Sequence, residues 1–242
     1  MNKETMKAVA WIGDKFVVGP ITGVIVTFHG LGDPGLKSVP TYEENEWASA
    51  GGLVVMPYPG PWSWMNRNAR AFVDELIGAV YANYGLSASV PLILTGGSMG
   101  GFCSLLYARY SKHPLKACQA LYPVCDLKHH FSERPDLPRT IHNAFYGYKE
   151  EMDSLFREHS PVDQVPGMPR IPYLIVHGDA DLAVNKAAHS DRMVRAMREN
   201  GLTVEYVEVP GMGHHAPLFF NVYRRTIDFV KGMLNSPKSP SP

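Results

Sequence analysis

Ser98 stands within a glycine-rich stretch, residues 96–101, whose sequence is GGSMGG. An apolar run precedes this stretch at 91–95 and an amphipathic run follows it at 102–110, a pattern that predicts strand, sharp turn and helix. Glycines two positions before and after the serine allow such a strand and helix to approach each other closely. A serine at the apex of this turn could act as a nucleophile, and the alternative is a glycine-rich loop without chemistry.

A pair of carboxylates follows a later apolar run, in the segment HGDAD at 177–181. Asp181 lies further into the predicted loop, where its carboxylate could orient a catalytic histidine and stabilise the cation of that histidine. Asp179 is nearer the strand end, and we expect it to fix the turn through backbone hydrogen bonds. Either aspartate could instead be a solvated turn residue.

A histidine doublet, His214-His215, lies on a glycine-containing loop just after the last predicted strand at 203–209. A histidine there can reach over the sheet toward Ser98 and accept its proton. Most histidines of a chain are ordinary surface or core residues. This doublet differs because the order along the chain becomes nucleophile, acid and base, although the residues alone leave the base open between its two members.

The oxyanion formed during acyl transfer needs two hydrogen-bond donors, which are usually backbone N–H groups. The amide of Met99 follows the serine directly and opens the predicted helix, where the helix dipole favours negative charge. The second donor is expected in the loop HGLGD at 29–33, most naturally the N–H of Leu31. His29 is then expected to brace this loop.

The elements that must position these residues alternate along the chain. Helices are expected at 42–49, at 66–84, at 102–110, along 187–197 and from Pro217 onward. An edge hairpin is expected at 8–18, with its turn at Gly13-Asp14. Strands are expected at 23–28, 52–57, 91–95, 116–122, 171–176 and 203–209. This alternation predicts an α/β fold: a mostly parallel central sheet with helices on both faces and functional residues beyond the carboxyl ends of the strands.

The proline-rich stretch 126–170 interrupts this alternation. We expect it to be a small insertion of short helices after the sixth strand, forming a partial lid over the site. The lid would offer four aromatic side chains: Phe131, Phe145, Tyr146 and Phe156. The candidate substrate-binding residues are Trp62, Trp64 and His29, and core packing is the alternative role for any aromatic residue among them. We expect one domain over 1–235 and a disordered tail at 236–242.

Composition excludes several classes of function. The 242 residues carry 23 basic and 23 acidic side chains, so no global field favours nucleic acid or an anionic membrane surface. Hydrophobic residues make up 45% and charged residues 19%, without an apolar run long enough to span a bilayer. The N-terminus lacks a secretory signal pattern, and the three cysteines suggest free thiols, so a cytoplasmic protein is expected. No metal-ligand cluster is evident, and no cofactor is expected.

These motifs resemble those of the α/β-hydrolase superfamily, in particular its compact carboxylesterases, dienelactone-hydrolase-like members and prolyl-oligopeptidase-like esterases. The HGLGD stretch at 29–33 is similar to that of the carboxylesterase and acyl-protein thioesterase group. Ser160-Pro161 is similar to the peptidase-like and dienelactone-hydrolase-like branch. A dienelactone hydrolase typically has cysteine at the nucleophile position, where this chain has Ser98, so that chemistry is not expected. The short N-terminus suggests that one of the usual eight strands is absent.

The resemblance implies a catalytic triad of Ser98, Asp181 and His214, with family spacing favouring His214 over His215. It implies oxyanion donors at the Leu31 and Met99 amides. The expected function is a serine carboxylic-ester hydrolase that acts on small to medium esters, aryl or carbohydrate-linked esters included, through an acyl-enzyme.

Other functions of the same fold stay open: a peptidase, a thioesterase or a non-catalytic binding protein. The peptidase hypothesis ranks second because no propeller-like segment precedes the catalytic part in the sequence. The expected partner is a small-molecule ester, and the sequence predicts no oligomeric state.

Overall fold

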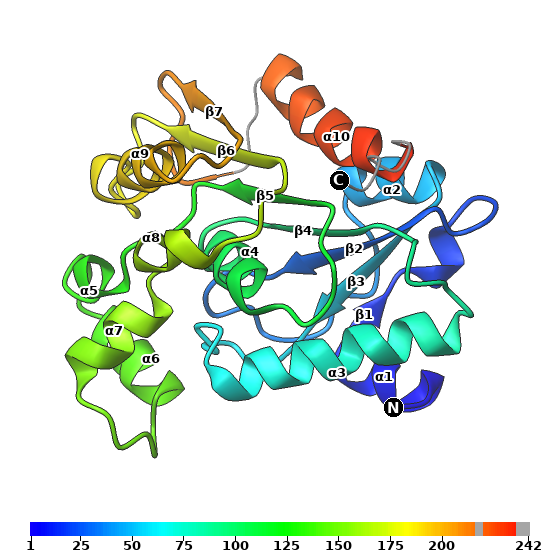
Figure 1. The fold of residues 1–242 in the computed structure, drawn as a ribbon, viewed down its shortest axis with the longest axis horizontal. Coiled ribbons are helices and arrows are strands. Elements are labelled where there is room, and N and C mark those ends of the chain that lie inside the picture. The colour runs from blue at the N-terminus through cyan, green and yellow to red at the C-terminus, as the bar shows by residue number, and fades with distance from the viewer. Residues whose placement is uncertain (216–219, 236–242) are drawn as a thin grey trace.

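The computed structural model describes residues 1–215 and 220–235, and it is built on one seven-stranded sheet (Figure 1). The strand order across the sheet is β1-β3-β2-β4-β5-β6-β7; β1 pairs antiparallel with β3, and all other pairs are parallel. The strands are β1 Ala10–Ile12, β2 Gly23–Phe28, β3 Gly52–Pro57, β4 Leu92–Gly96, β5 Ala117–Leu121, β6 Tyr173–Gly178 and β7 Val204–Val209. The predicted α/β-hydrolase architecture is confirmed in its mostly parallel sheet.

Helices cover both faces of the sheet. One apolar core joins the sheet to α3, α4 and α9, and a second joins its other face to α2 and α10. The helices are α1 Lys3–Val9, α2 Tyr42–Ser49, α3 Arg67–Asn83, α4 Met99–Tyr110, α5 Leu127–His130, α6 Leu137–Ala144, α7 Met152–His159, α8 Pro161–Gln164, α9 Arg192–Glu199 and α10 Phe220–Asn235. Short 3₁₀ turns lie at Asp14–Phe16 and Val165–Gly167, and a π-helical turn at Ala187–Asp191 precedes α9.

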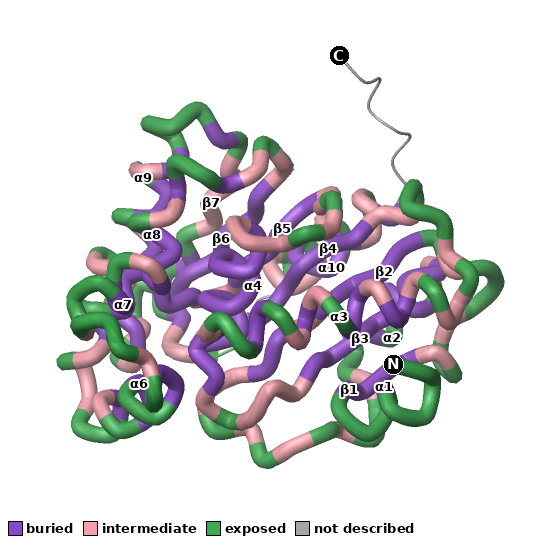
Figure 2. Tube along the Cα trace, turned by 60° about the horizontal axis from the view of Figure 1, so that its bottom comes forward, coloured by how far each residue is buried: buried purple, intermediate pink, exposed green. Residues whose placement is uncertain are grey.

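The sequence of the central strands explains why both faces are covered. β2, β3 and β4 are nearly continuous runs of branched apolar residues, and almost every position in them is buried. Figure 2 shows this buried centre, with exposed residues concentrated on the outer helices and loops. The ends of these strands are therefore held rigidly, which suits them to position reactive side chains.

The expected edge hairpin at 8–18 is wrong. Residues 10–12 instead pair with β3 of the sheet, Trp11 opposite Met56, and the N–H of Gly13 donates to the carbonyl of Val54. A short helix, capped by the Asn2 side chain, precedes this strand. Since the hairpin contributes one strand and not two, the insertion follows the fifth strand rather than the sixth.

The insertion consists of short helices, as expected, from α5 to α8. These helices extend from one end of the sheet (Figure 1), and Leu137, Ile141 and Phe156 anchor them to the larger core. The expected helix start at Pro217 and the expected disorder of 236–242 lie outside the described residues.

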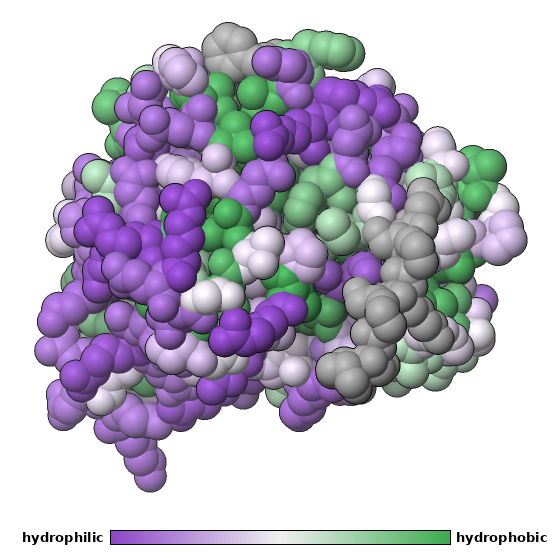
Figure 3. Space-filling view, turned by 45° about the horizontal axis from the view of Figure 1, so that its top comes forward, coloured by the Kyte–Doolittle hydropathy of each residue, from purple (hydrophilic) through white to green (hydrophobic). Residues whose placement is uncertain are grey.

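The outer surface is mixed in character. Figure 3 shows charged and polar side chains interspersed with small apolar areas on the face in view. Of the helices that the structure describes, none combines the length and the apolar character that a membrane crossing requires.

Candidate active site

The turn between β4 and α4 holds Ser98 in a strained backbone conformation. Its φ is 57° and its ψ is −124°, values that L-residues rarely adopt. The N–H of Ser98 donates to the carbonyl of Leu121, and its carbonyl accepts from Phe102 in the first turn of α4. Neighbouring elements thus hold the turn, and the side chain projects from it.

Two glycines make this turn sterically feasible, as the sequence pattern predicts. A Cβ atom at Gly100 would lie 2.1 Å from the carbonyl oxygen of Phe28, and one at Gly96 would lie 2.6 Å from the carbonyl oxygen of Gly100. Strands β2 and β4 and helix α4 therefore approach each other more closely than any side chain permits at these positions.

We expect Gly100→Ala to lower the free energy of unfolding by about 1–3 kcal/mol, because the new methyl group must displace the backbone of β2. Urea denaturation measures the change. Gly78→Ala on α3 is the matched control, since the nearest atom to its added Cβ lies at 3.8 Å. In an open helical position alanine is favoured over glycine by up to about 1 kcal/mol. Equal effects of the two substitutions would contradict this steric account.

His214 connects Ser98 to Asp181 through two hydrogen bonds. Its Nε2 lies 2.9 Å from Ser98 Oγ, and its Nδ1 lies 2.7 Å from Asp181 Oδ2. Because an ionised carboxylate only accepts, Nδ1 carries the proton of the neutral ring and Nε2 is free to accept from the serine hydroxyl. The structure therefore brings together the three side chains that the sequence singles out, in the arrangement that a general base requires.

The Asp181 carboxylate is fully buried and receives several donors. Its Oδ1 accepts the amides of Ala183 at 2.8 Å and Val184 at 2.9 Å. Burial alone raises the pKa of this carboxyl, but hydrogen bonds from His177, His214 and the two amides outweigh it and lower the pKa well below its usual range. Asp181 is thus ionised at neutral pH and held in one orientation.

His177 at the end of β6 is a neighbour of Asp181 to which the sequence analysis gives no role. Its Nε2 lies 3.2 Å from Asp181 Oδ2 and 3.2 Å from the Val184 carbonyl oxygen, and its Nδ1 lies 2.6 Å from Ser190 Oγ. Nε2 faces two acceptors, so it carries the proton, and Nδ1 accepts from the serine hydroxyl. His177 therefore contacts the same carboxylate oxygen of Asp181 as His214 does.

We expect Asp181→Asn to lower kcat by about 10³–10⁴-fold, since an amide neither fixes the His214 tautomer nor stabilises its cation. Steady-state hydrolysis measures the loss. Asp179→Asn is the matched control, because its Oδ1 accepts the N–H of Gly211 at 2.6 Å and an amide oxygen can do the same. Asp179 thus accepts a backbone hydrogen bond as expected, but from the loop after β7 and not from its own turn. Comparable losses in both variants would contradict the assignment.

The two expected oxyanion donors lie on adjacent segments, Leu31 in the loop after β2 and Met99 at the first residue of α4. Phe28 pairs with Gly96 in the sheet, so the loop after β2, which carries Leu31, runs beside the turn that carries Ser98. Within the described residues, neither the N–H of Leu31 nor that of Met99 has a hydrogen-bond partner. An amide that is to stabilise an oxyanion must be unpaired in this way.

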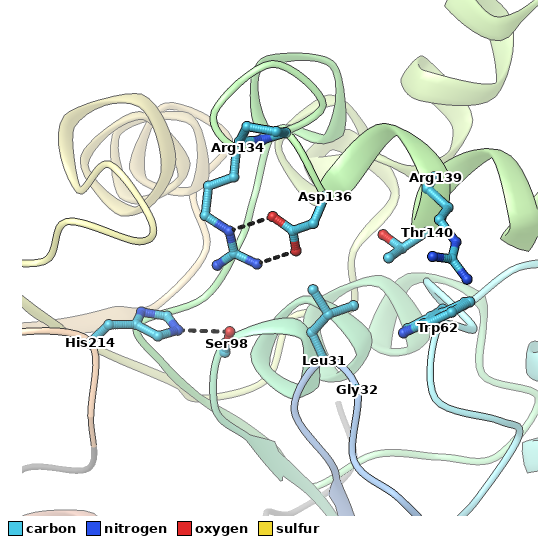
Figure 4. A pocket seen from close by; sticks show the side chains of 10 residues that line it. Leu31, Gly32, Trp62, Ser98, Arg134, Asp136, Arg139, Thr140 and His214 are labelled. Carbon is cyan, nitrogen blue, oxygen red and sulfur yellow. Dashed lines mark hydrogen bonds and ion pairs between the residues drawn. The ribbon is translucent and has the colours of Figure 1, made fainter.

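Ser98 and His214 open into a pocket of about 600 Å³ (Figure 4). This volume suits a substrate group of moderate size. The lining residues come from the loops after β2 and β3, the turn before α4, the insertion and the loop after β7. They are Leu31, Gly32, Trp62, Ser98, Arg134, Pro135, Asp136, Arg139, Thr140 and His214.

Of the candidate substrate residues, only Trp62 lines this pocket. The expectation for Trp64 is wrong: this side chain is fully buried, packs edge-on against Phe102 and donates from Nε1 to Thr140 Oγ1 at 3.1 Å. His29 is also buried; its Nδ1 lies 2.8 Å from the Gly30 carbonyl oxygen and its ring packs against Tyr58. His29 braces its loop rather than contacting substrate.

The insertion forms part of the pocket wall, but with other side chains than expected. None of the four aromatic residues proposed from the sequence lines the pocket; Tyr146 is 90% exposed, and Phe145 and Phe156 are buried. The wall consists instead of the polar segment at the start of α6. Arg134 and Asp136 pair through two hydrogen bonds, of 3.1 and 2.8 Å, while Arg139 lies over Trp62 (Figure 4). The only sequence signal for them was the alternating charge of this segment.

A polar cluster beside the pocket has metal-ligand residue types. One ligand atom from each of His129, Glu133 and His189 lies within 4.8 Å of the others. The Nδ1 of His189 accepts the amides of Cys125 and Asp126, both at 3.1 Å, so its proton resides on Nε2, which donates to Glu133 at 2.9 Å. With both ring nitrogens engaged, His189 offers a metal no lone pair. The hydrogen bonds of this cluster hold in place the segment that directly precedes Arg134 of the pocket wall.

A comparison with protein families was informative for most of the chain. Residues 70–237, more than half of the chain, match the prolyl oligopeptidase family. A comparison with curated proteins finds no match.

Solved structures of similar fold include several peptidases. A puromycin-hydrolyzing peptidase of Mycobacterium tuberculosis superposes with a TM-score of 0.74 at 18% identity over 92% of this chain and 36% of that chain. An acylaminoacyl peptidase of Pyrococcus horikoshii gives 0.76 at 15% identity over 96% and 40%, respectively. Dipeptidyl peptidase 4 of Porphyromonas gingivalis gives 0.68 at 18% over 91% and 33%. The chain thus spans at most two fifths of the length of these three proteins.

Proposed function

The chain belongs to the prolyl oligopeptidase family of serine hydrolases, and from this premise we propose that it is a peptidase that cleaves amide bonds through an acyl-enzyme on Ser98. The observation that carries the proposal is the hydrogen-bonded series Ser98–His214–Asp181, of which Ser98 and His214 line an open pocket. The similar structures named above are peptidases, which supports amide over ester as the bond cleaved.

In the acylation step, His214 Nε2 accepts the proton of Ser98 while Oγ attacks the carbonyl carbon. Negative charge passes to the carbonyl oxygen, which the amides of Leu31 and Met99 would stabilise. When the C–N bond breaks, His214 returns the proton to the departing amine. Asp181 keeps the proton of His214 on Nδ1 throughout and stabilises the imidazolium.

In the deacylation step, a water molecule replaces the amine. His214 takes a proton from this water, whose oxygen attacks the acyl carbon, and then returns the proton to Ser98 Oγ as the acid departs. His214 accepts and returns the proton in both steps, so the reaction requires no cofactor.

A carboxylic-ester hydrolase is the second candidate, and the open pocket with two free backbone amides supports it. The same residues would act on small to medium esters or thioesters, because only the leaving atom differs. An ester oxygen departs more readily than an amine, so activity on activated esters alone does not separate the two functions.

The test compares substrates with one acyl group and three leaving groups. N-acylated dipeptides are offered as p-nitroanilide, methyl ester and thioester, to the wild type and to Ser98→Ala. A peptidase cleaves the anilide and unlabelled peptides of several residues, and all activity disappears in the variant. Turnover of esters without any amide cleavage across the panel would replace the peptidase proposal with the esterase one.

A further inference from the structure

The three charged residues of the insertion that line the pocket are not equivalent. Arg134 donates from Nε and Nη2 to the two carboxylate oxygens of Asp136, so the charges of this pair compensate each other. Arg139, on the first turns of α6, has no ion-pair partner in the part of the chain that the structure describes. The pocket therefore presents one uncompensated guanidinium.

Trp62 gives this guanidinium a defined place. The guanidinium carbon of Arg139 lies 5.4 Å from the centroid of the Trp62 ring, and both residues line the pocket. Stacking on an aromatic face attracts a cation and limits the motion of a long side chain. A pre-positioned guanidinium retains donors in the fork geometry that matches a carboxylate. The pair thus has the composition of an anion subsite.

The position of this pair relative to His214 indicates which part of a substrate it contacts. The leaving group must lie toward His214, because that residue gives it a proton. In Figure 4, Leu31 lies between the Ser98–His214 pair and the Trp62–Arg139 pair. A substrate group at Arg139 is therefore on the acyl side, and the compensated pair Arg134–Asp136 is nearer to Ser98 and His214.

We propose that Arg139, stacked on Trp62, binds a carboxylate carried by the acyl part of the substrate, so that the enzyme prefers anionic acyl groups. The proposal deepens the proposed function and rests on Ser98 being acylated. Two kinds of substrate carry such a carboxylate: a peptide with an acidic side chain before the scissile bond, and the monoester of a dicarboxylic acid. The two are distinguished by the experiment below.

The experiment measures the ratio of kcat/KM for an acid and its neutral analogue. One arm uses the p-nitroanilides of acetyl-Glu-Ala and acetyl-Gln-Ala. The other uses mono-p-nitrophenyl adipate and its methyl ester. The proteins are the wild type, Arg139→Gln, Arg139→Lys and Trp62→Leu. Arg198→Gln is the matched control, because Arg198 is exposed on α9 and is not part of the pocket wall.

The wild type should prefer the acid over its neutral analogue in at least one arm. A charge-assisted hydrogen bond at an open site corresponds to a preference of about tenfold. Arg139→Gln should lower kcat/KM for the acid more than for its neutral analogue and so remove this preference. Arg139→Lys should keep part of it, and Trp62→Leu should weaken it. Arg198→Gln should retain the full ratio. Added salt should reduce the ratio in the wild type, because Arg139 is exposed to solvent.

The proposal is overturned if the wild type shows no preference in either arm, or if Arg139→Gln slows acid and neutral substrates equally. It is also overturned if Arg139 acts only on carboxylates of the leaving group, tested with acetyl-Phe-Ala and its C-terminal amide. If both anilides resist cleavage while the adipate pair is discriminated, the peptidase proposal fails and the subsite stands. Thermal unfolding of each variant verifies that it is folded.

Discussion

Ser98→Ala is expected to lower kcat on the order of 10⁶-fold for every substrate that the wild type hydrolyses. The loss is large because the hydroxyl oxygen forms the covalent bond to the acyl group, and no neighbouring side chain can replace it. The residual rate would come from the pocket and the free amides of Leu31 and Met99, acting on water. Steady-state kinetics with an anilide and an ester of the same acyl group measures the effect.

Ser104→Ala is the matched control for this substitution. Ser104 lies six residues further on in α4, where its buried hydroxyl donates to the carbonyl of Gly100 at 2.9 Å. Its removal affects packing near the turn but deletes no reacting atom, so kcat should stay close to the wild-type value. If Ser98→Ala retained substantial activity in a preparation free of contaminating hydrolase, Ser98 would not be the nucleophile.

The second large effect is expected for His214, and it decides between the two members of the histidine doublet. His214→Ala removes the one side chain, among the described residues, that contacts both Ser98 Oγ and the Asp181 carboxylate. In a comparable triad, loss of the base is about as severe as loss of the nucleophile, on the order of 10⁶ in kcat. The loss should be the same for esters and amides whenever acylation limits the rate.

His215→Ala provides the comparison at the next position. His215 is an exposed residue that does not line the pocket, so its replacement should leave kcat within a few-fold of the wild type. A greater loss in His215→Ala than in His214→Ala would reverse the assignment.

Local sequence signals predicted the central elements because those signals are themselves local. The expected helix at 42–49 coincides with α2 Tyr42–Ser49, whose start is fixed by a capping box on Thr41. The buried runs that form β2, β3 and β4 require coverage on both faces, and the glycines beside Ser98 are demanded by contacts within the turn. The candidate nucleophile, acid and base each follow a strand. They lie together because parallel strands end at one edge of the sheet.

The parts that escaped prediction depend on partners distant in the chain. Trp11 pairs with Met56 across the sheet, which no pattern within residues 8–18 reveals. Trp62 and Trp64 are two residues apart, yet only Trp62 reaches the pocket, because the positive φ angles of Trp64 and Met65 turn the chain inward. The sequence likewise does not reveal that Arg139 lies in the pocket wall, because this depends on where the insertion packs against the rest of the chain.

Covalent labelling of Ser98 is the measurement that tests the account most directly. The wild-type protein is treated with a fluorophosphonate, which captures only an activated serine, and the modified residue is located by mass spectrometry of its peptides. We predict one adduct, located on Ser98, absent from Ser98→Ala and greatly slowed in His214→Ala. An adduct on another residue, or a folded and active enzyme that takes up no label at Ser98, would contradict the account.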